Sequence, residues 1–103
     1  MIRQFDLIEN PSPRTRRQYP YLVVLQSHHL AASNLTVVAP VLRGDEPTVT
    51  LTSVPFEFDG RDFVLLVGEL TAVDTQRLGR AAGSLGDHED AIRRALERVF
   101  TGF

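Results

Sequence analysis

The sequence has no cysteine, no lysine and no tryptophan among its 103 residues. Without cysteine the chain forms no disulfide, and thiol catalysis and cysteine-ligated metal sites are excluded. The absence of lysine leaves arginine as the only strongly basic residue, which fits a GC-rich genome and carries no functional conclusion. A formal net charge of −2 argues against general nucleic-acid binding, which normally requires a basic face. We therefore expect no direct sequence-specific contact with nucleic acid.

Long apolar runs are also lacking. The longest, residues 21–25 and 63–67, have the length of core strands and are too short to span a bilayer. The first six residues lack the apolar region of a secretory signal. These features predict a cytoplasmic protein with no membrane partner, folded as a single domain over residues 1–103.

The distribution of apolar and β-branched residues predicts a mostly β domain. Asp59-Gly60 separates two apolar runs and indicates a hairpin, because glycine tolerates positive φ. Pro40 lies inside a predicted strand, which suggests an edge position or a bulge. Residues 70–83 allow two interpretations, a strand with a turn or a weak helix broken at Gly79 and Gly83. Strands are predicted over residues 5–7, 19–26, 35–42, 48–52, 56–58 and 63–67, with loops at 10–17 and 28–34 and a turn at 44–47.

One helix is predicted, in the C-terminal segment. Apolar residues recur there at helical spacing in a single stripe. Ser84 or Asp87 is suited to cap the N-terminus, and Gly102 to end the helix. Two acid-first pairs at i, i+4, Glu89–Arg93 and Asp90–Arg94, support it. The stripe consists of Ile92, Ala95, Leu96, Val99 and Phe100.

Three stretches and the tail together resemble the CcdB family of toxins. Residues 19–27 are similar to the family's long early strand, which ends in Val-Gln-Ser, and residues 36–42 resemble its Val-Ile-Pro-Leu strand. Residues 85–95 resemble its acidic helix start. The tail, residues 100–103, lies where the family ends in Phe-Trp-Gly-Ile.

The resemblance implies both a fold and a function. The fold is an SH3-like twisted antiparallel β-barrel with a C-terminal α-helix, of the CcdB/MazF type, paired as a symmetric homodimer. The family's dimer enters the A subunit of DNA gyrase, traps the cleaved-DNA complex, and is neutralised by a CcdA-like antitoxin. Such a toxin breaks no bond itself, so the chain is expected to be an inhibitor without a cofactor, and not an enzyme.

The gyrase-binding residues implied by the resemblance begin with the tail, Thr101, Gly102 and Phe103. Thr101 occupies the place of the family's tryptophan, which stacks on a gyrase arginine. Losing that contact costs about 0.5–2 kcal/mol, or up to about thirtyfold in affinity. Phe103 either offers its ring instead or closes the end of the helix, and both interpretations stay open. Phe100, on the apolar stripe, is expected to pack against the barrel.

The resemblance also aligns His29 and Leu30 with a surface pair that grips gyrase, and Glu97 with a helix position on the same face. His28 and His29 are adjacent, but neighbouring side chains diverge on most backbones and no third ligand lies at a fitting spacing. We therefore expect no metal site.

Two alternatives remain open. MazF-type toxins, which cut messenger RNA, share this barrel, and an endoribonuclease requires a basic groove with a general acid or base. The basic cluster Arg14, Arg16 and Arg17, with the hydroxyl of Thr15, is the candidate for such a groove, although no acid–base pair accompanies it. The third possibility is a dimer of the same fold that binds antitoxin but no longer poisons gyrase.

Overall fold

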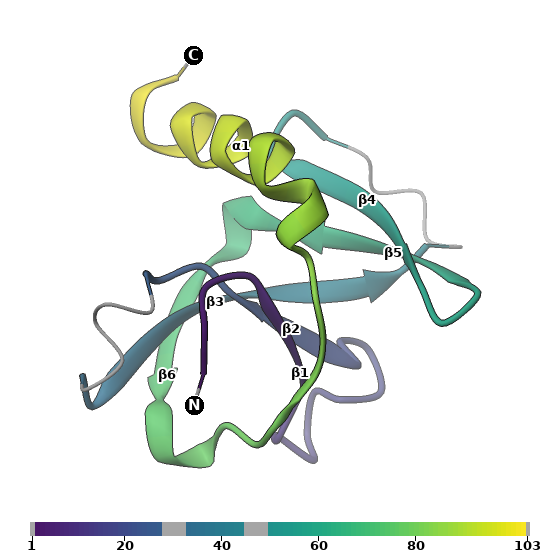
Figure 1. Cartoon of the computed structure of the whole chain (residues 1–103), viewed down its shortest axis with the longest axis vertical. Helices are drawn as coiled ribbons and strands as arrows, with labels where there is room; N and C mark the ends of the chain where they lie inside the picture. The colour runs from purple at the N-terminus through teal and green to yellow at the C-terminus, as the bar shows by residue number, and fades with distance from the viewer. Residues whose placement is uncertain (1, 28–32, 45–49, 103) are drawn as a thin grey trace.

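The computed structural model describes residues 2–27, 33–44 and 50–102, and this part forms one curled antiparallel sheet with a C-terminal helix (Figure 1). This architecture confirms the prediction of a mostly β fold ending in a helix. The strands are β1 (Asp6–Glu9), β2 (Tyr21–Val24), β3 (Leu35–Arg43), β4 (Ser53–Phe58), β5 (Arg61–Leu66), β6 (Thr71–Asp74) and β7 (Ala81–Ser84). The helices are α1 (Glu89–Thr101) and the 3-10 turns η2 (Val67–Glu69), η3 (Thr75–Arg77) and η4 (Gly86–His88).

Strand β3 organises the sheet, whose order is β4-β5-β3-β2-β1-β7. One side of β3 pairs with β2 along four residues. Its other side pairs with β6 through residues 35–38 and with β5 through residues 41–43. Pro40 faces Leu22 of β2 and falls in the gap between these two partners. The edge or bulge expected at Pro40 is therefore wrong: a residue without an N–H is accommodated in a central strand at the point where the strand changes partner.

The predicted hairpin is confirmed. β4 and β5 pair without interruption from Ser53–Leu66 to Phe58–Arg61. Asp59 and Gly60 have φ of 53° and 76°, the two consecutive positive values of a type I′ turn. The strand expected over residues 48–52 is wrong for its described part, because Thr50 and Ser53 close a turn there through a 2.7 Å bond from the Thr50 N–H to the Ser53 hydroxyl. Residues 70–83 follow the first interpretation, with strands β6 and β7 joined through η3.

The main core lies between the curled sheet and α1, which crosses one side of the sheet in Figure 1. Leu7, Val23 and Leu65 are fully buried in this cluster. A second cluster around Ile8 and Val38 lies on another face, partly covered by side chains from the N-terminus, β6 and the segment after η3. Both faces of the central strands are thus apolar, as the continuous runs in their sequence predict.

Helix α1 follows the predicted stripe only in part. Ile92 and Ala95 are buried, and Leu96 and Val99 are half-buried against the core. The expected packing of Phe100 is wrong: its side chain is 70% exposed. Phe100 lies at the last turn, rotated by about one residue's angle from the buried row, where the sheet no longer reaches it. Within the described part of the chain, no helix has the length and apolar character to cross a membrane.

The N-terminus of α1 also differs from expectation. His88 occupies the N-cap position and makes no side-chain capping bond. The hydroxyl of Ser84 instead accepts a 3.1 Å bond from the Gly86 N–H, one turn earlier. Of the two predicted ion pairs, Arg93–Glu89 forms at 2.8 Å, whereas none joins Asp90 to Arg94. Asp90–Arg94 is therefore wrong as a direct contact.

Candidate functional site

The C-terminal end of α1 is held in a defined shape by two local hydrogen bonds. Gly102 adopts a left-handed conformation with φ 80°, and its N–H donates to the carbonyl of Arg98 at 3.1 Å. This is the αL form of helix ending, which favours glycine because other residues clash at positive φ. The hydroxyl of Thr101 donates to the carbonyl of Glu97 at 2.6 Å. The last turn is therefore internally bonded up to its final residue.

A third bond attaches this end to the rest of the fold. Arg98 donates from Nη1 to the backbone carbonyl of Leu51 at 3.0 Å, just before β4. Because the acceptor is a main-chain atom, the bond fixes the position of the helix without depending on the Leu51 side chain, which is 77% exposed.

Four residues at this end form one exposed surface, which we name the helix-end surface: Glu97, Phe100, Thr101 and Gly102. Residues three and four apart are neighbours on a helix, so Glu97 lies beside both Phe100 and Thr101. The surface combines a carboxylate, an aromatic ring and a glycine turn. A ring that is 70% exposed on a fixed helix offers a partner a flat apolar or cation-binding contact.

The structure thus brings three of the six predicted gyrase-binding residues together: Glu97, Thr101 and Gly102. His29, Leu30 and Phe103 lie outside the described residues. Phe100 lies on the same surface, although the helical periodicity assigned it to the core. The sequence does carry a signal for this exposure, which is the position of Phe100 in the last turn before Gly102. The end of an apolar stripe can extend beyond the sheet that buries the rest of it.

The predicted basic loop is a folded element stabilised by Asn10. The side-chain amide of Asn10 donates to the Thr15 hydroxyl and to the Tyr19 carbonyl, both at 2.9 Å. Its carbonyl oxygen accepts the Ser12 N–H at 3.0 Å. Asn10 is 7% exposed, so these bonds satisfy a buried polar group. Thr15 therefore serves to close the loop, while Arg14, Arg16 and Arg17 remain exposed on it.

Two further arginines, Arg43 and Arg61, lie near that loop at one end of the sheet. They line adjoining hollows with Tyr21 and with the loop residue Pro20. In the sequence each of them adjoins a glycine, as Arg43-Gly44 and Gly60-Arg61. This pattern indicates that each arginine lies beside a turn. It does not indicate that the two turns lie side by side in the fold.

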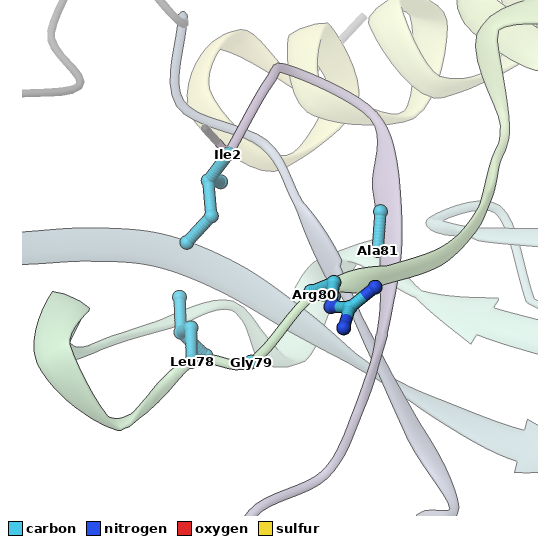
Figure 2. A pocket seen from close by; sticks show the side chains of 5 residues that line it. All are labelled: Ile2, Leu78, Gly79, Arg80 and Ala81. Atoms are coloured by element: carbon cyan, nitrogen blue, oxygen red, sulfur yellow. The ribbon is translucent and has the colours of Figure 1, made fainter.

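A separate groove of about 600 Å³ lies between the N-terminal segment and the start of β7. Figure 2 shows the side chains of Ile2 and Leu78 facing one another across it, with Arg80 and Ala81 beside them. The described residues that line it carry no carboxylate and no imidazole, so they present apolar contacts and one guanidinium.

His88 is positioned by packing. Its ring lies 6.2 Å from that of Phe56, at the junction between η4 and α1. Among residues 2–27, 33–44 and 50–102, no three histidine, aspartate or glutamate side chains are grouped as metal ligands would be.

The chain is similar in sequence to one protein family and in fold to solved toxin structures. The sequence profile of one protein family, described as CcdB protein, matches residues 4–102. No curated protein matches the chain. A crystal structure described as an Mtb toxin superposes with a TM-score of 0.73 and 19% identity, covering 91% of this chain and 99% of the other. The Mycobacterium tuberculosis toxin MazF-mt6 superposes with a TM-score of 0.71 and 17% identity, covering 95% and 96%. At these identities the two structures establish a shared fold, as predicted.

Proposed function

The chain belongs to the CcdB family, and on that basis we propose that it is a toxin that binds the A subunit of DNA gyrase and traps the cleaved-DNA complex. In this proposal it acts in the cytoplasm as a homodimer, breaks no bond itself, and is neutralised by a CcdA-like antitoxin. The match over residues 4–102 covers every element of the described fold, including the helix that carries the tail.

The observation that carries the proposal is the exposed ring of Phe100 on a fixed helix end. The resemblance aligns Thr101 with the tryptophan that contacts a gyrase arginine. Thr101 has no aromatic ring and its hydroxyl is bonded within the helix, so this residue does not replace the stacking contact of the tryptophan. Phe100 is adjacent and 70% exposed, and its ring supplies the aromatic face that an arginine of gyrase requires. Phe103 remains a second candidate for this contact.

Glu97 gives the surface a charge that complements an arginine. It lies one turn before Thr101 and is exposed. A guanidinium stacked on the Phe100 ring would have the Glu97 carboxylate within reach, since residues i and i+3 are neighbours on the helix. His29 and Leu30 extend the gyrase contact in the proposal, as the resemblance implies.

The test is a DNA-cleavage assay with purified protein and gyrase from its own host. Linear DNA should accumulate with dose for the unmodified chain and disappear when residues 101–103 are deleted. Phe100→Ser should weaken the effect by about twofold to thirtyfold, the range that a cation–π contact of about 0.5–2 kcal/mol corresponds to.

Leu51→Ser is the matched control, because it also removes an exposed apolar side chain but leaves the bond from Arg98 to the Leu51 carbonyl in place. It should cleave like the unmodified chain. Size-exclusion chromatography of both variants checks that the oligomeric state is unchanged. Equal loss in both variants would contradict a specific role for Phe100, and no linear DNA from any form would contradict gyrase poisoning.

The second candidate function is that of an endoribonuclease. Two observations favour it: the fold shared with a MazF toxin, and the arginines at the hollowed end of the sheet. The Thr15 hydroxyl, which the sequence suggested as a catalytic group, accepts a hydrogen bond from the Asn10 amide. Its role in the structure is therefore to close the loop before β2. Cleavage of an RNA substrate in the absence of any gyrase effect would select this function. Tight antitoxin binding with neither activity would select the third possibility, a dimer that has lost poisoning.

A further inference from the structure

The groove between the N-terminal segment and the start of β7 stands on the second apolar cluster of the fold. Ile2 and Leu78 face one another across it in Figure 2, and both also pack against that cluster, which includes the buried Ile8 and Val38. Its volume of about 600 Å³ lies within the range of about 300–1,000 Å³ that is typical of small-ligand sites. We name it the N-terminal groove, formed by residues 2 and 78–81.

The wall that carries Ile2 is held by a turn over residues 3–6. The Arg3 N–H donates to the Asp6 carboxylate at 2.8 Å, and the Asp6 N–H donates to the Arg3 carbonyl at 3.1 Å. Phe5 lies between them with φ 71°, a conformation that a bulky residue keeps only where its surroundings hold it. The Phe5 N–H donates to the Val24 carbonyl at 2.7 Å, which joins the turn to β2. Three hydrogen bonds therefore set the direction of the segment that carries Ile2.

The opposite wall, which carries Leu78, is joined to β3. The Thr75 N–H donates to the Asn34 carbonyl at 2.9 Å, and the hydroxyls of Thr36 and Thr75 form a hydrogen bond of 2.7 Å. The Leu78 N–H closes η3 by donating to the Thr75 carbonyl at 3.2 Å. Because the fold itself fixes both walls, the groove is present before a ligand binds, as is usual for small-ligand sites.

A β-bulge lies beside the groove, near the start of β7. Leu7 pairs with Gly83 and Ile8 with Ala81, so Ala82 is an extra residue on β7. Bulges bend their strand and are common next to functional sites. Just before the bulge, a Cβ on Gly79 would meet no atom within 4 Å. The groove is therefore open at Gly79, where a ligand can enter.

Arg80 gives the groove its charge. Within residues 2–27, 33–44 and 50–102, its side chain makes neither a hydrogen bond nor an ion pair, and it is exposed. The described residues that line the groove include no carboxylate. A guanidinium matches a carboxylate with two parallel N–H donors. The complement of the groove is therefore a ligand with one carboxylate and an apolar body.

The limited extent of the apolar surface favours a small molecule over a protein partner. Next to the groove the chain is polar and exposed, at Arg3, Gln76 and Arg77. None of the large apolar side chains that are exposed elsewhere on the described surface lines the groove. A specific protein interface buries about 1,200–2,000 Å² in total, whereas an apolar groove with one charged group has the composition of a small-molecule site.

We infer that the N-terminal groove binds a small organic acid with one carboxylate and an apolar chain, such as a medium-chain fatty acid. The chain lies between Ile2 and Leu78, and the carboxylate pairs with Arg80. The inference is independent of the proposed function, because the groove shares no residue with the helix-end surface.

The test is a heteronuclear NMR titration of the full chain with octanoate, in which each backbone amide is followed. Octanol, which has no charge, and acetate, which has no chain, are the ligand controls. Octanoate should bind with a Kd on the order of 1 mM and perturb the amides of residues 2 and 78–81. Octanol should bind about threefold to tenfold more weakly, because an exposed ion pair adds little affinity. Acetate should give no measurable binding, since it lacks the apolar contact.

Two variants separate the charge of the groove from its space. Arg80→Gln should weaken octanoate binding by about threefold to tenfold and leave octanol binding unchanged. Arg77→Gln is the matched control, because it removes the same charge from an exposed position outside the groove lining, and it should bind octanoate like the unmodified chain.

Gly79→Leu fills the groove and should abolish binding of both octanoate and octanol. It should fold normally, because the φ of Gly79 lies outside the left-handed region and a Cβ there meets no atom within 4 Å. Thermal unfolding of each variant checks that the fold is retained.

Three results would overturn the inference. The first is no perturbation of the groove amides at about ten times the expected Kd of octanoate. The second is octanoate binding that Gly79→Leu leaves unchanged. The third is a change in the sedimentation of Gly79→Leu together with no response to octanoate, which would mean that the groove is a contact between copies of the chain.

The gyrase assay on the same preparations keeps this inference apart from the proposed function. Octanoate binding that depends on Arg80, in a protein that does not poison gyrase, would support the groove and remove the toxin function. Poisoning in a protein whose groove does not respond to octanoate would remove the groove alone.

Discussion

The Thr101 hydroxyl donates a 2.6 Å hydrogen bond to the carbonyl of Glu97, one helical turn earlier. Threonine commonly bonds back in this way, and the bond occupies the one polar hydrogen of its side chain. Thr101 thus completes the helix and offers a partner its methyl group and a hydroxyl oxygen that can only accept. Under the proposed function, the contact that the family's tryptophan makes would fall to the neighbouring Phe100, whose ring is exposed, or to Phe103.

The residues of the apolar stripe of α1 should differ in how much they contribute to the stability of the fold. Ile92→Ala should lower the free energy of unfolding by about 2–5 kcal/mol, because Ile92 is fully buried and its truncation leaves a cavity. Phe100→Ala should change it by no more than about 0.5 kcal/mol, as for other exposed positions. Urea denaturation of both variants measures the difference. A loss at Phe100 as large as that at Ile92 would mean that its ring is covered in solution, for example by a second copy of the chain.

Gly102 should be needed for the shape of the helix end. Its φ of 80° is accessible to glycine at no cost, whereas alanine there should lower the free energy of unfolding by about 1 kcal/mol. Gly102→Asn should be milder, because asparagine tolerates this conformation better. Thermal unfolding of the two variants is the measurement. Equal melting temperatures for Gly102→Ala and the unmodified chain would contradict a fixed helix end.

Two glycines should respond oppositely to the same substitution. Gly44→Ala forces a Cβ to within 2.7 Å of the Asp62 backbone, so β3 and β5 must separate locally at a cost of about 1–3 kcal/mol. Gly79→Ala meets no atom within 4 Å and should be neutral or slightly stabilising. Chemical denaturation compares them directly. Unchanged stability of Gly44→Ala would contradict the close approach of β3 and β5.

Asn10 should be the residue on which the loop before β2 depends. Asn10 is buried, and Asn10→Ala removes its three hydrogen bonds to Ser12, Thr15 and Tyr19, which should cost about 1–3 kcal/mol. Asn34→Ala is the control, because Asn34 is exposed and its main-chain carbonyl, which accepts from Thr75, is unaffected. Hydrogen exchange of the Tyr19 and Ser12 amides should accelerate in the first variant alone. Equal exchange in both would show that the loop is held by other contacts.

The sequence predicted the elements whose cause is local. Asp59-Gly60 specifies its hairpin through the φ values that these two residues tolerate, and the strand pairing follows from it. The 3.6-residue period located α1, and Gly102 ended it as predicted. For the candidate site, the resemblance supplied Glu97, Thr101 and Gly102, which share the helix end, and His29, Leu30 and Phe103, which lie outside the described residues. As gyrase contacts, all six stay predictions.

Only the tertiary structure decided which residues are exposed or paired, because this depends on where one element stops covering the next. The period of α1 assigned Phe100 to the core, but the curled sheet ends before the last turn, so the ring is exposed. Pro40 is tolerated in a central strand because β3 changes partner beside it, from β6 to β5. Arg43 and Arg61 stand apart in the chain and line one hollow because β3 pairs with β5. Local pattern determines which face of an element is apolar, whereas long-range pairing determines which residues that face reaches.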